Sequence, residues 1–356
     1  MIYYIKEPEY SGMDTVTARS KARVDAETIF GRRGYTPLEL NLPSKFSTSG
    51  IKRLGWHLDS RKRWAGTLSK LSEQDVLIIQ YPCTDFNLLL PGVIRQAKAK
   101  TVLLLHDWER YRHIANKEEG LGRRIKCSIE EKLLQYADRI IVHNDIMRSK
   151  MAESGIDQDK LISLGIFDYL IDGIDLGRLE QRKNDLSMPV IVAGNLTRQK
   201  AGYVYDLPEE PDFNLFGAGY DNKAKANIHY HGSFAPDDLP YHLKGSFGLV
   251  WDGPTSKTCS GANGSYLRIN NPHKTSLYLS SGIPVIIWSE AALAGFVKEN
   301  NCGITVDSLD KLKEAIANTN DSEYEEMRTN AVKLSVALRA GSYLSGALTK
   351  AESALV

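Results

Sequence analysis

Short apolar runs alternate along the chain with longer segments in which apolar positions recur at helical spacing. In the first half, this pattern predicts five strands, at Tyr3–Lys6, Leu38–Asn41, Val76–Tyr81, Val102–His106 and Ile140–Val142. Helices are expected between and after them, near Thr15–Arg33, Ile51–Leu71, Asn87–Lys98, Gly122–Ala137 and Ile146–Ser154. Such alternation is typical of a parallel sheet covered by helices on both faces.

A polar, charged stretch at residues 168–187 interrupts the alternation and reads as a linker. The alternation then restarts with six predicted strands, at Val190–Ala193, Phe213–Phe216, Ile228–Tyr230, Gly248–Trp251, Val285–Trp288 and Ile304–Val306. Four more helices are expected, at Pro272–Ser281, Ala291–Asn300, Leu309–Asn318 and Tyr324–Ala340.

A chain of 356 residues is too long for one ordinary core, so two α/β domains are expected. We predict an N-terminal Rossmann-like domain at 1–170, a linker at 171–187 and a second Rossmann-like domain at 188–320. The helices of 321–356 are expected to pack back on the first domain. Two doubly wound halves of this kind would face a cleft, with ligands bound outside the carboxyl ends of the strands.

Composition narrows the class of protein. Forty-five basic and 44 acidic residues give a formal net charge of +1, which argues against nucleic acid as a partner. The four cysteines are widely spaced, as expected for reduced thiols, and form neither a zinc motif nor a redox pair. The sequence begins without the pattern of a signal peptide and has no run of 18 apolar residues. These features favour a cytoplasmic protein.

The strongest candidate for chemistry is the start of the predicted helix at Pro272–Ser281. Asn271 suits the N-cap and Pro272 the first helical position, so Lys274 falls in the first turn. A cation there opposes the helix dipole unless an anion binds at the same end. Free backbone N–H groups together with a lysine make a phosphate site. The alternative is a solvated surface lysine.

The segment upstream of this helix supports the first interpretation. An apolar strand ends in Asp252-Gly253, and the Gly-rich stretch Ser260–Ser265 then predicts a mobile loop. A strand, a flexible loop and an anion-binding helix in series suit a nucleotide site. A plain strand-to-helix connection rarely needs so long a loop.

These residues carry a resemblance to a known family. The runs Phe247–Asp252, Asn271–Lys274 and Gly282–Ile286 resemble the bacterial glucosyltransferases that extend sugars on serine-rich repeat adhesins. They are similar also to the related β-1,6-galactofuranosyltransferases. The resemblance implies the GT-B fold, a UDP-sugar donor, a glycan or glycoprotein acceptor, and neither a metal nor another cofactor in the site.

The resemblance also implies a set of donor contacts. It places the hydroxyl of Thr17 (with Thr15 as a rival), Arg198 and Tyr230 at the nucleotide-sugar. It adds the helix start itself, namely Ile269, Asn270, Asn271, Pro272, His273 and Lys274. Arg198 and Lys274 would neutralise the diphosphate as it leaves. Taken singly, Arg198 could be a surface ion pair and Tyr230 a core aromatic.

His106 and Asp107 end a buried strand in the first domain, at the expected acceptor side. Either could act as general base on an acceptor hydroxyl. The alternative is a polar pair that caps the next segment, and the sequence does not choose between them.

A second cluster lies in the predicted helix Ile51–Leu71, where Trp56 and Trp64 are interleaved with Lys52, Arg53, Arg61, Lys62 and Arg63. Three interpretations stay open: a membrane-facing helix, a surface for acceptor or oligomer contacts, and a solvated helix with two buried tryptophans. Peripheral contact with the inner face of a membrane and homo-oligomer formation are therefore among our expectations.

The predicted function is transfer of glucose, galactose or galactofuranose from a UDP-sugar to a hydroxyl of a glycan or glycosylated protein. The alternatives are an idle glycosyltransferase-like subunit that binds a partner enzyme or glycan, and a nucleotide-sugar enzyme such as an epimerase.

Overall fold

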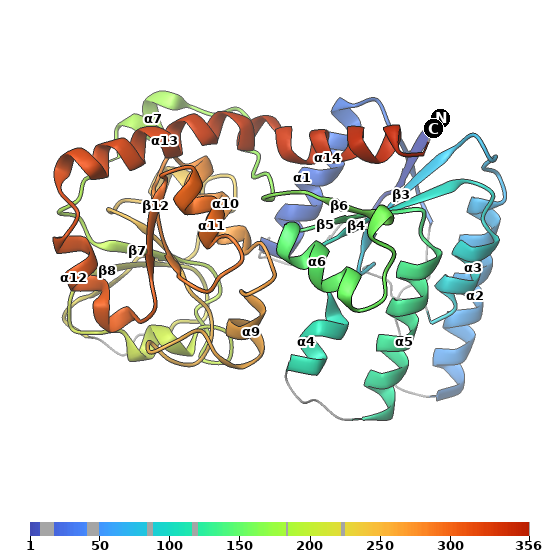
Figure 1. Ribbon diagram of the computed structural model, residues 1–356, viewed down its shortest axis with the longest axis horizontal. Coiled ribbons are helices and arrows are strands. Elements are labelled where there is room, and N and C mark those ends of the chain that lie inside the picture. The colour runs from blue at the N-terminus through green and yellow to red at the C-terminus, as the bar shows by residue number, and fades with distance from the viewer. Residues whose placement is uncertain are drawn as a thin grey trace. The chain divides into compact units, whose positions relative to one another are not determined.

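The computed structural model describes residues 1–7, 18–40, 50–83, 88–115, 120–182, 184–221 and 225–355. Thr15 and Thr17, which sequence analysis placed at the donor, lie outside this part of the chain. The chain divides into two compact units, shown in Figure 1. The first comprises Met1–Gly12, Ala26–Gly165 and Leu344–Val356, and the second Met13–Asp25 and Ile166–Tyr343.

The first unit is built on a six-stranded parallel sheet with the order β2-β1-β3-β4-β5-β6. Its strands are β1 (Ile2–Ile5), β2 (Thr36–Leu38), β3 (Val76–Tyr81), β4 (Lys100–Leu105), β5 (Arg139–Val142) and β6 (Leu161–Ser163). The residues of β3 and β4 after the first are buried on both faces, which explains their unbroken apolar runs.

Helices connect these strands and cover the sheet (Figure 1). They are α1 (Ala18–Arg32, part of this unit from Ala26 onward), α2 (Gly50–Leu68), α3 (Leu90–Gln96), α4 (Glu109–Ala115), α5 (Leu121–Tyr136), α6 (Asp145–Glu153) and the short 3₁₀ helix Gln158–Lys160. The C-terminal helix α14 (Ser342–Ser353) returns to this unit from Leu344 onward. There Glu352 Oε1 and Arg33 Nη2 form a 2.7 Å ion pair.

The second unit repeats the architecture with the order β12-β11-β10-β7-β8-β9, again all parallel. Its strands are β7 (Val190–Ala193), β8 (Phe213–Phe216), β9 (Ile228–Tyr230), β10 (Gly248–Val250), β11 (Val285–Trp288) and β12 (Gly303–Val306). From β7 the chain winds outward through β8 and β9, then returns to the other side of β7 with β10. The winding direction therefore reverses between β7 and β10, which are neighbours.

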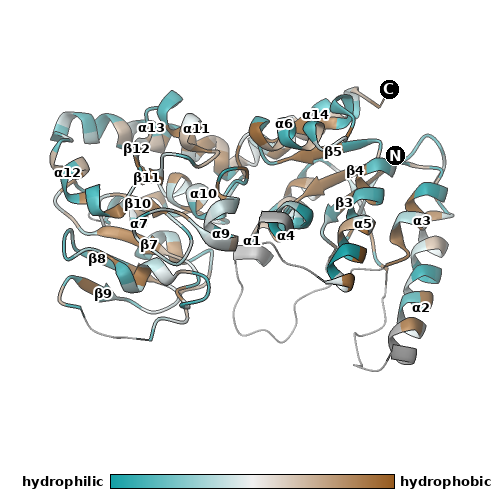
Figure 2. Cartoon of the chain, turned by 60° about the horizontal axis from the view of Figure 1, so that its bottom comes forward, coloured by the Kyte–Doolittle hydropathy of each residue, from teal (hydrophilic) through white to brown (hydrophobic). Residues whose placement is uncertain are grey.

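The helices of the second unit are α7 (Leu176–Glu180), α8 (Leu239–His242), α9 (Gly261–Tyr266), α10 (His273–Ser280), α11 (Ala294–Glu299), α12 (Leu312–Ala317) and α13 (Asp321–Ala340), with 3₁₀ turns at Gly202–Asp206 and Leu309–Lys311. A capping box of Asn320 and Glu323 begins α13, and Gly341 in the left-handed conformation ends it. Helix α13 packs along α10 and covers it. Figure 2 shows the strands of each unit in brown, with teal on the helices.

The predicted pair of doubly wound α/β halves is confirmed, and one local prediction was wrong. The Gly-rich stretch Ser260–Ser265, expected as a loop, forms helix α9 from Gly261 onward, in which Gly264 and Tyr266 are buried. The expected linker contains the short helix α7 at residues 176–180, whose N-cap Asp175 accepts from the Arg178 N–H. Among the described helices, none is both long and apolar enough to cross a bilayer.

Candidate functional site

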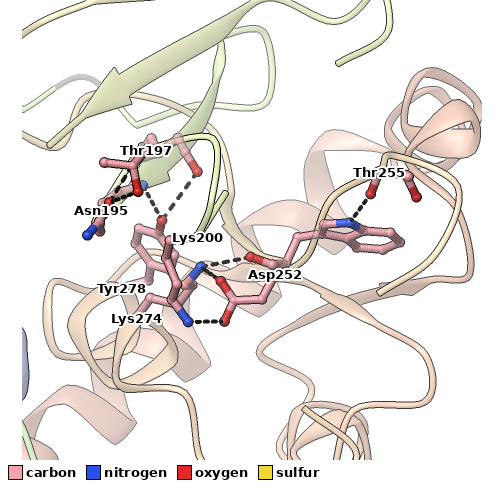
Figure 3. A network of polar contacts seen from close by, with 10 residues as sticks. Asn195, Thr197, Lys200, Asp252, Thr255, Lys274 and Tyr278 are labelled. Carbon is pink, nitrogen blue, oxygen red and sulfur yellow. Dashed lines mark hydrogen bonds and ion pairs between the residues drawn. The ribbon is translucent and has the colours of Figure 1, made fainter. Parts of the chain in front are cut away.

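The point where the winding direction reverses in the second sheet gathers the polar residues of this unit. β7 leads into residues 194–200, β10 leads into Trp251-Asp252-Gly253, and α10 begins 20 residues later at His273. Because parallel strands present their carboxyl ends at one edge, side chains from both exits meet there (Figure 3). Ligands of open α/β sheets bind at such switch points.

An ion triad of two lysines and one aspartate lies at this edge. Lys274 Nζ donates to Asp252 Oδ1 at 3.0 Å and to the carbonyl of Trp251 at 2.8 Å. Lys200 Nζ donates to Asp252 Oδ2 at 3.3 Å. The three residues come from the β10 exit, the β7 exit and the first turn of α10 (Figure 3). The triad therefore ties together the elements that meet at the switch point.

The charge of this triad is not balanced. Burial disfavours the charged form of the Asp252 carboxylate, but the ammonium groups of Lys200 and Lys274 more than offset this and lower its pKa. With Asp252 ionised, one positive charge remains in excess. It lies at the positive end of the α10 dipole, so this edge favours an anionic ligand.

The start of α10 differs in detail from the prediction. The N-cap is Pro272, without a side-chain capping bond, and the helix begins at His273. Asn271 is therefore not the N-cap, because the chain turns into the helix one residue later than its cap-forming type suggested. Asn271 and Ile269 are buried just ahead of the helix, at 4% and 1% exposure.

Buried polar atoms surround this helix start. The side-chain oxygens of Asn270, Thr275 and Ser276 are shielded from solvent and, within the described part of the chain, have no hydrogen-bond partner. Buried polar groups are normally paired, so an unpaired group asks for an explanation. Three of them beside the first turn of a helix fit a site that a polar ligand completes.

Tyr278 fixes α10 against the sheet. Its hydroxyl accepts a 2.7 Å bond from the N–H of Ala193, the last residue of β7. Its ring lies so close to Gly248 that a Cβ at that glycine would approach the ring carbons to 2.1 Å. Gly248 is therefore required for α10 to pack this close to β10.

His273 is an uncharged residue of the helix start. Burial of its ring, followed by the nearby Lys21 ammonium, lowers the pKa of His273 to about 4. The ring lies 5.1 Å from that of Tyr169, centroid to centroid. A neutral, packed imidazole here adds no positive charge to the triad.

The exits of β7 and β8 approach each other closely. Gly217 has φ +145°, and a Cβ there would lie 1.7 Å from the carbonyl oxygen of Gly194. The Asn195 side chain accepts from both the N–H and the hydroxyl of Thr197, which shapes the turn after β7. This turn delivers Arg198 and Lys200 to the sheet edge.

Arg198 and Tyr230 have protein partners of their own. Arg198 donates to Asp221 Oδ2 through Nε at 3.0 Å and Nη2 at 2.7 Å, and its guanidinium lies 3.8 Å over the ring of Tyr205. Tyr230 closes β9 and donates its hydroxyl to the Gly217 carbonyl at 2.9 Å. Both side chains are more than one third exposed, so both are accessible from solvent.

The predicted general-base candidates lie in the first unit, at the β4 exit. His106 Nε2 lies 2.7 Å from Gln80 Oε1, and the Gln80 amide lies 3.4 Å from Glu27. Asp107 forms a 3.3 Å ion pair with Arg112. A glutamine that donates to Glu27 presents its carbonyl to His106, which places the His106 proton on Nε2.

Sequence analysis missed Lys200, Tyr278 and the part that Asp252 plays. Lys200 stands two residues after Arg198 at a strand exit, so its position was an available signal. Asp252 was predicted only to mark the end of a strand. Within the described ranges, no group of three or more histidine, cysteine, aspartate or glutamate side chains is arranged to hold a metal ion.

Comparison with solved structures identifies the fold. Sucrose-phosphate synthase from Thermosynechococcus elongatus matches with a TM-score of 0.63 at 12% identity, over 100% of this chain and 99% of that one. WaaG, a glycosyltransferase involved in lipopolysaccharide biosynthesis, matches with a TM-score of 0.58 at 12% identity, over 96% and 98% of the two chains. The fold is that of the GT-B glycosyltransferases, as predicted.

Comparison of sequences identifies the family. The model described as "Glucosyltransferase 3-like, N-terminal domain" matches residues 2–166, and "Glucosyltransferase 3-like, C-terminal domain" matches residues 190–351. The chain belongs to this glycosyltransferase family. It is 38% identical over 285 residues to the β-1,6-galactofuranosyltransferase WbbI of Escherichia coli, covering 79% of this chain and 80% of WbbI. It is 25% identical to glucosyltransferase 3 of Streptococcus gordonii, covering 79% and 80%. The predicted resemblance is confirmed.

Proposed function

We propose that the protein transfers a hexose, namely glucose, galactose or galactofuranose, from a UDP-sugar to a hydroxyl of a glycan or glycosylated protein. The observation that carries the proposal is the excess positive charge of the Lys200–Asp252–Lys274 triad at the start of α10. The names of the relatives support the class of sugar. A structural neighbour, HepE of Anabaena, was solved with UDP and glucose, which supports the nucleotide; it matches with a TM-score of 0.58 at 11% identity, over 98% of this chain and 99% of that one.

The diphosphate would bind at the first turn of α10. Backbone N–H groups there and the Lys274 ammonium would stabilise the negative charge that develops as UDP leaves. The unpaired side-chain oxygens of Asn270 and Thr275 lie beside the same turn and would bond ribose, sugar or phosphate groups. Arg198 would exchange its ion pair with Asp221 for a phosphate, since both partners are exposed. No metal ion is part of this proposal.

The acceptor hydroxyl would be activated in the first unit. With its proton on Nε2, His106 carries a lone pair on Nδ1, and Gln80 and Glu27 hold that tautomer in place. Asp107 is the alternative base. Under this proposal His106→Ala or Asp107→Asn lowers kcat by about 10²–10⁴-fold, depending on which is the base, while the Kd for UDP stays unchanged.

Calorimetry with UDP tests the donor site. Lys274→Ala and Arg198→Ala should each weaken binding by roughly tenfold or more, because each removes a charge-assisted bond. Lys311→Ala is the matched control, since Lys311 pairs with Asp307 on the same unit. Unchanged affinity in both variants would refute the site assignment. A folded wild type without UDP affinity would favour an idle, partner-binding subunit.

A donor screen with UDP-glucose, UDP-galactose and UDP-galactofuranose would identify the sugar. Two further proposals concern the oligomeric state of the protein and its location in the cell. Assembly of the chain into a homo-oligomer is testable by light scattering. Action in the cytoplasm at the inner face of a membrane is supported by one surface of the first unit, described next.

A further inference from the structure

A surface cavity of about 770 Å³ lies in the first unit, formed by residues of α2, α3 and α5. Helix α3 packs against both of the other helices. The cavity belongs to neither the donor site nor the His106–Asp107 pair. Its lining combines apolar and basic side chains, among them Leu58, Arg61, Arg95, Ile129, Lys132 and Tyr136.

The basic side chains of this cavity lie apart from the acidic side chains that the structure describes. Among the described residues, no carboxylate forms an ion pair with Arg61, Arg95 or Lys132. Arg95 lies 5.6 Å over the ring of Tyr136, which holds its guanidinium at the wall. Helices α2, α3 and α5 together carry ten basic and three acidic residues, a surplus of seven in a chain whose formal net charge is +1. The surplus of positive charge in the chain is therefore carried by these three helices.

Exposed apolar side chains extend from the cavity along the same helices. Leu54 and Leu58 of α2 are 59% and 53% exposed, and Leu121 and Ile125 of α5 are 77% and 44% exposed. Each pair is four residues apart, so its members lie on one face of their helix, and Leu58 lines the cavity. Both helices begin at the same end of the unit in Figure 1, and brown and teal alternate along α2 in Figure 2.

We infer that this α2–α5 face, defined by Leu54, Leu58, Leu121, Ile125, Arg61, Arg95 and Lys132, binds the surface of an anionic phospholipid bilayer. The three cations take headgroup phosphates in and around the cavity. The four apolar side chains enter the boundary between headgroups and acyl chains, as in interfacial amphipathic helices.

The basic and apolar features together favour a bilayer over a soluble anionic ligand. A free phosphate would neutralise cations of the cavity and leave the two apolar pairs in water. An acidic peptide would neutralise the cations, but it offers no apolar layer for side chains projecting from two separate helices. A bilayer supplies both phosphates and a deformable apolar layer over the whole face. The inference does not depend on the proposed donor or acceptor.

Vesicle sedimentation with the full chain tests this inference. The wild type should bind vesicles of phosphatidylcholine and phosphatidylglycerol far better than phosphatidylcholine alone, and salt should weaken binding. The charge variant Arg61→Gln/Arg95→Gln/Lys132→Gln should lose roughly 100-fold in partitioning, about fivefold for each cation. The apolar variant Leu54→Ser/Leu121→Ser/Ile125→Ser should also lose binding, although its charge is unchanged. The control Lys298→Gln/Lys333→Gln/Lys350→Gln removes equal charge elsewhere and should bind like the wild type.

Several results would overturn the inference. One is equal binding of the wild type to neutral and anionic vesicles. Another is a control variant as weak as the charge variant, since binding would then follow net charge alone. Full retention in the apolar variant, or complete competition by inorganic phosphate or polyglutamate, would point to a soluble anion or an acidic protein. UDP affinity measured on the same variants should be unchanged, which keeps this outcome separate from that of the donor site.

Discussion

The ammonium of Lys274 and the carboxylate of Asp252 lie 3.0 Å apart, although 22 residues separate them in the chain. The aspartate is nearly buried at the β10 exit, and the lysine stands in the first turn of α10. A lysine in that position opposes the helix dipole, at a cost of some tenths of a kcal/mol. Asp252 offsets this cost and holds the ammonium at the place where a diphosphate would bind.

Replacing Asp252 with asparagine should destabilise the second unit by about 2–4 kcal/mol, because Lys200 and Lys274 would then face each other without a counter-charge. The pKa of Asp252 is lowered in the folded protein, so its contribution is present above the unfolded value of about 4. That contribution is lost as the pH falls through the lower folded value. Urea unfolding at pH 7 and at pH 3 measures both effects.

The matched control for this change is Asp307→Asn, which removes an exposed carboxylate paired with Lys311. It should shift stability by less than about 0.5 kcal/mol. If Asp252→Asn is no more destabilising than the control at pH 7, the triad does not hold the site together.

His273 should make the protein less stable in mild acid. Its pKa is about 4 in the folded protein, against about 6.5 when unfolded, so the unfolded chain binds the extra proton between these values. Stability from this group is complete above pH 6.5 and falls by about 3 kcal/mol as the pH drops to 4. His273→Phe removes that part of the pH dependence.

Urea midpoints of the wild type and His273→Phe, followed from pH 7.5 to pH 4, give the comparison. His143, whose pKa burial lowers to about 3, contributes equally to both proteins and cancels in the difference. Parallel curves for the two proteins would show that His273 is not held neutral by burial.

Tyr278→Phe should cost about 1–3 kcal/mol, because the buried N–H of Ala193 loses its acceptor. The loss should also loosen α10 and weaken UDP binding. Tyr324→Phe is a suitable control, since its buried hydroxyl donates to the Ser246 carbonyl, which lies ahead of β10 and not at its carboxyl end. Equal effects of the two changes on UDP affinity would argue against a positioning role for Tyr278.

The central strands of the two sheets were predictable from the sequence because they are buried on both faces. The apolar runs of β3 and β11, for example, leave little choice of element. The site was predictable only in part. Helix capping is a local property, so Lys274 could be placed in a first turn. Its partner Asp252 could not be assigned, because that contact depends on how α10 packs against β10.

The glycine content misled the prediction at α9 for a similar reason. Gly264 lies in α9, and glycine is needed there because a Cβ would come within 2.6 Å of the Cys259 backbone, a tertiary contact that composition does not reveal. A Gly-rich sequence predicts flexibility, whereas in α9 the glycine permits close packing. The same distinction applies to Gly217, because the close approach that requires a glycine there depends on how β7 and β8 pair.

Gly217→Ala should therefore destabilise the second unit by more than about 3 kcal/mol, because two costs add. The residue has φ +145°, and a new Cβ would meet the Gly194 carbonyl at 1.7 Å. Gly232→Ala separates these costs, since Gly232 has φ +81° and nothing within 4 Å of a Cβ. It should lose only about 1–2 kcal/mol, from backbone strain alone. Thermal unfolding ranks the two variants, and calorimetry should show weaker UDP binding for Gly217→Ala because the β7 exit carries Arg198 and Lys200. Equal losses of stability in the two variants would mean that the β7 and β8 exits can move apart to accommodate a Cβ. The close approach of these exits would then not determine the geometry of the site.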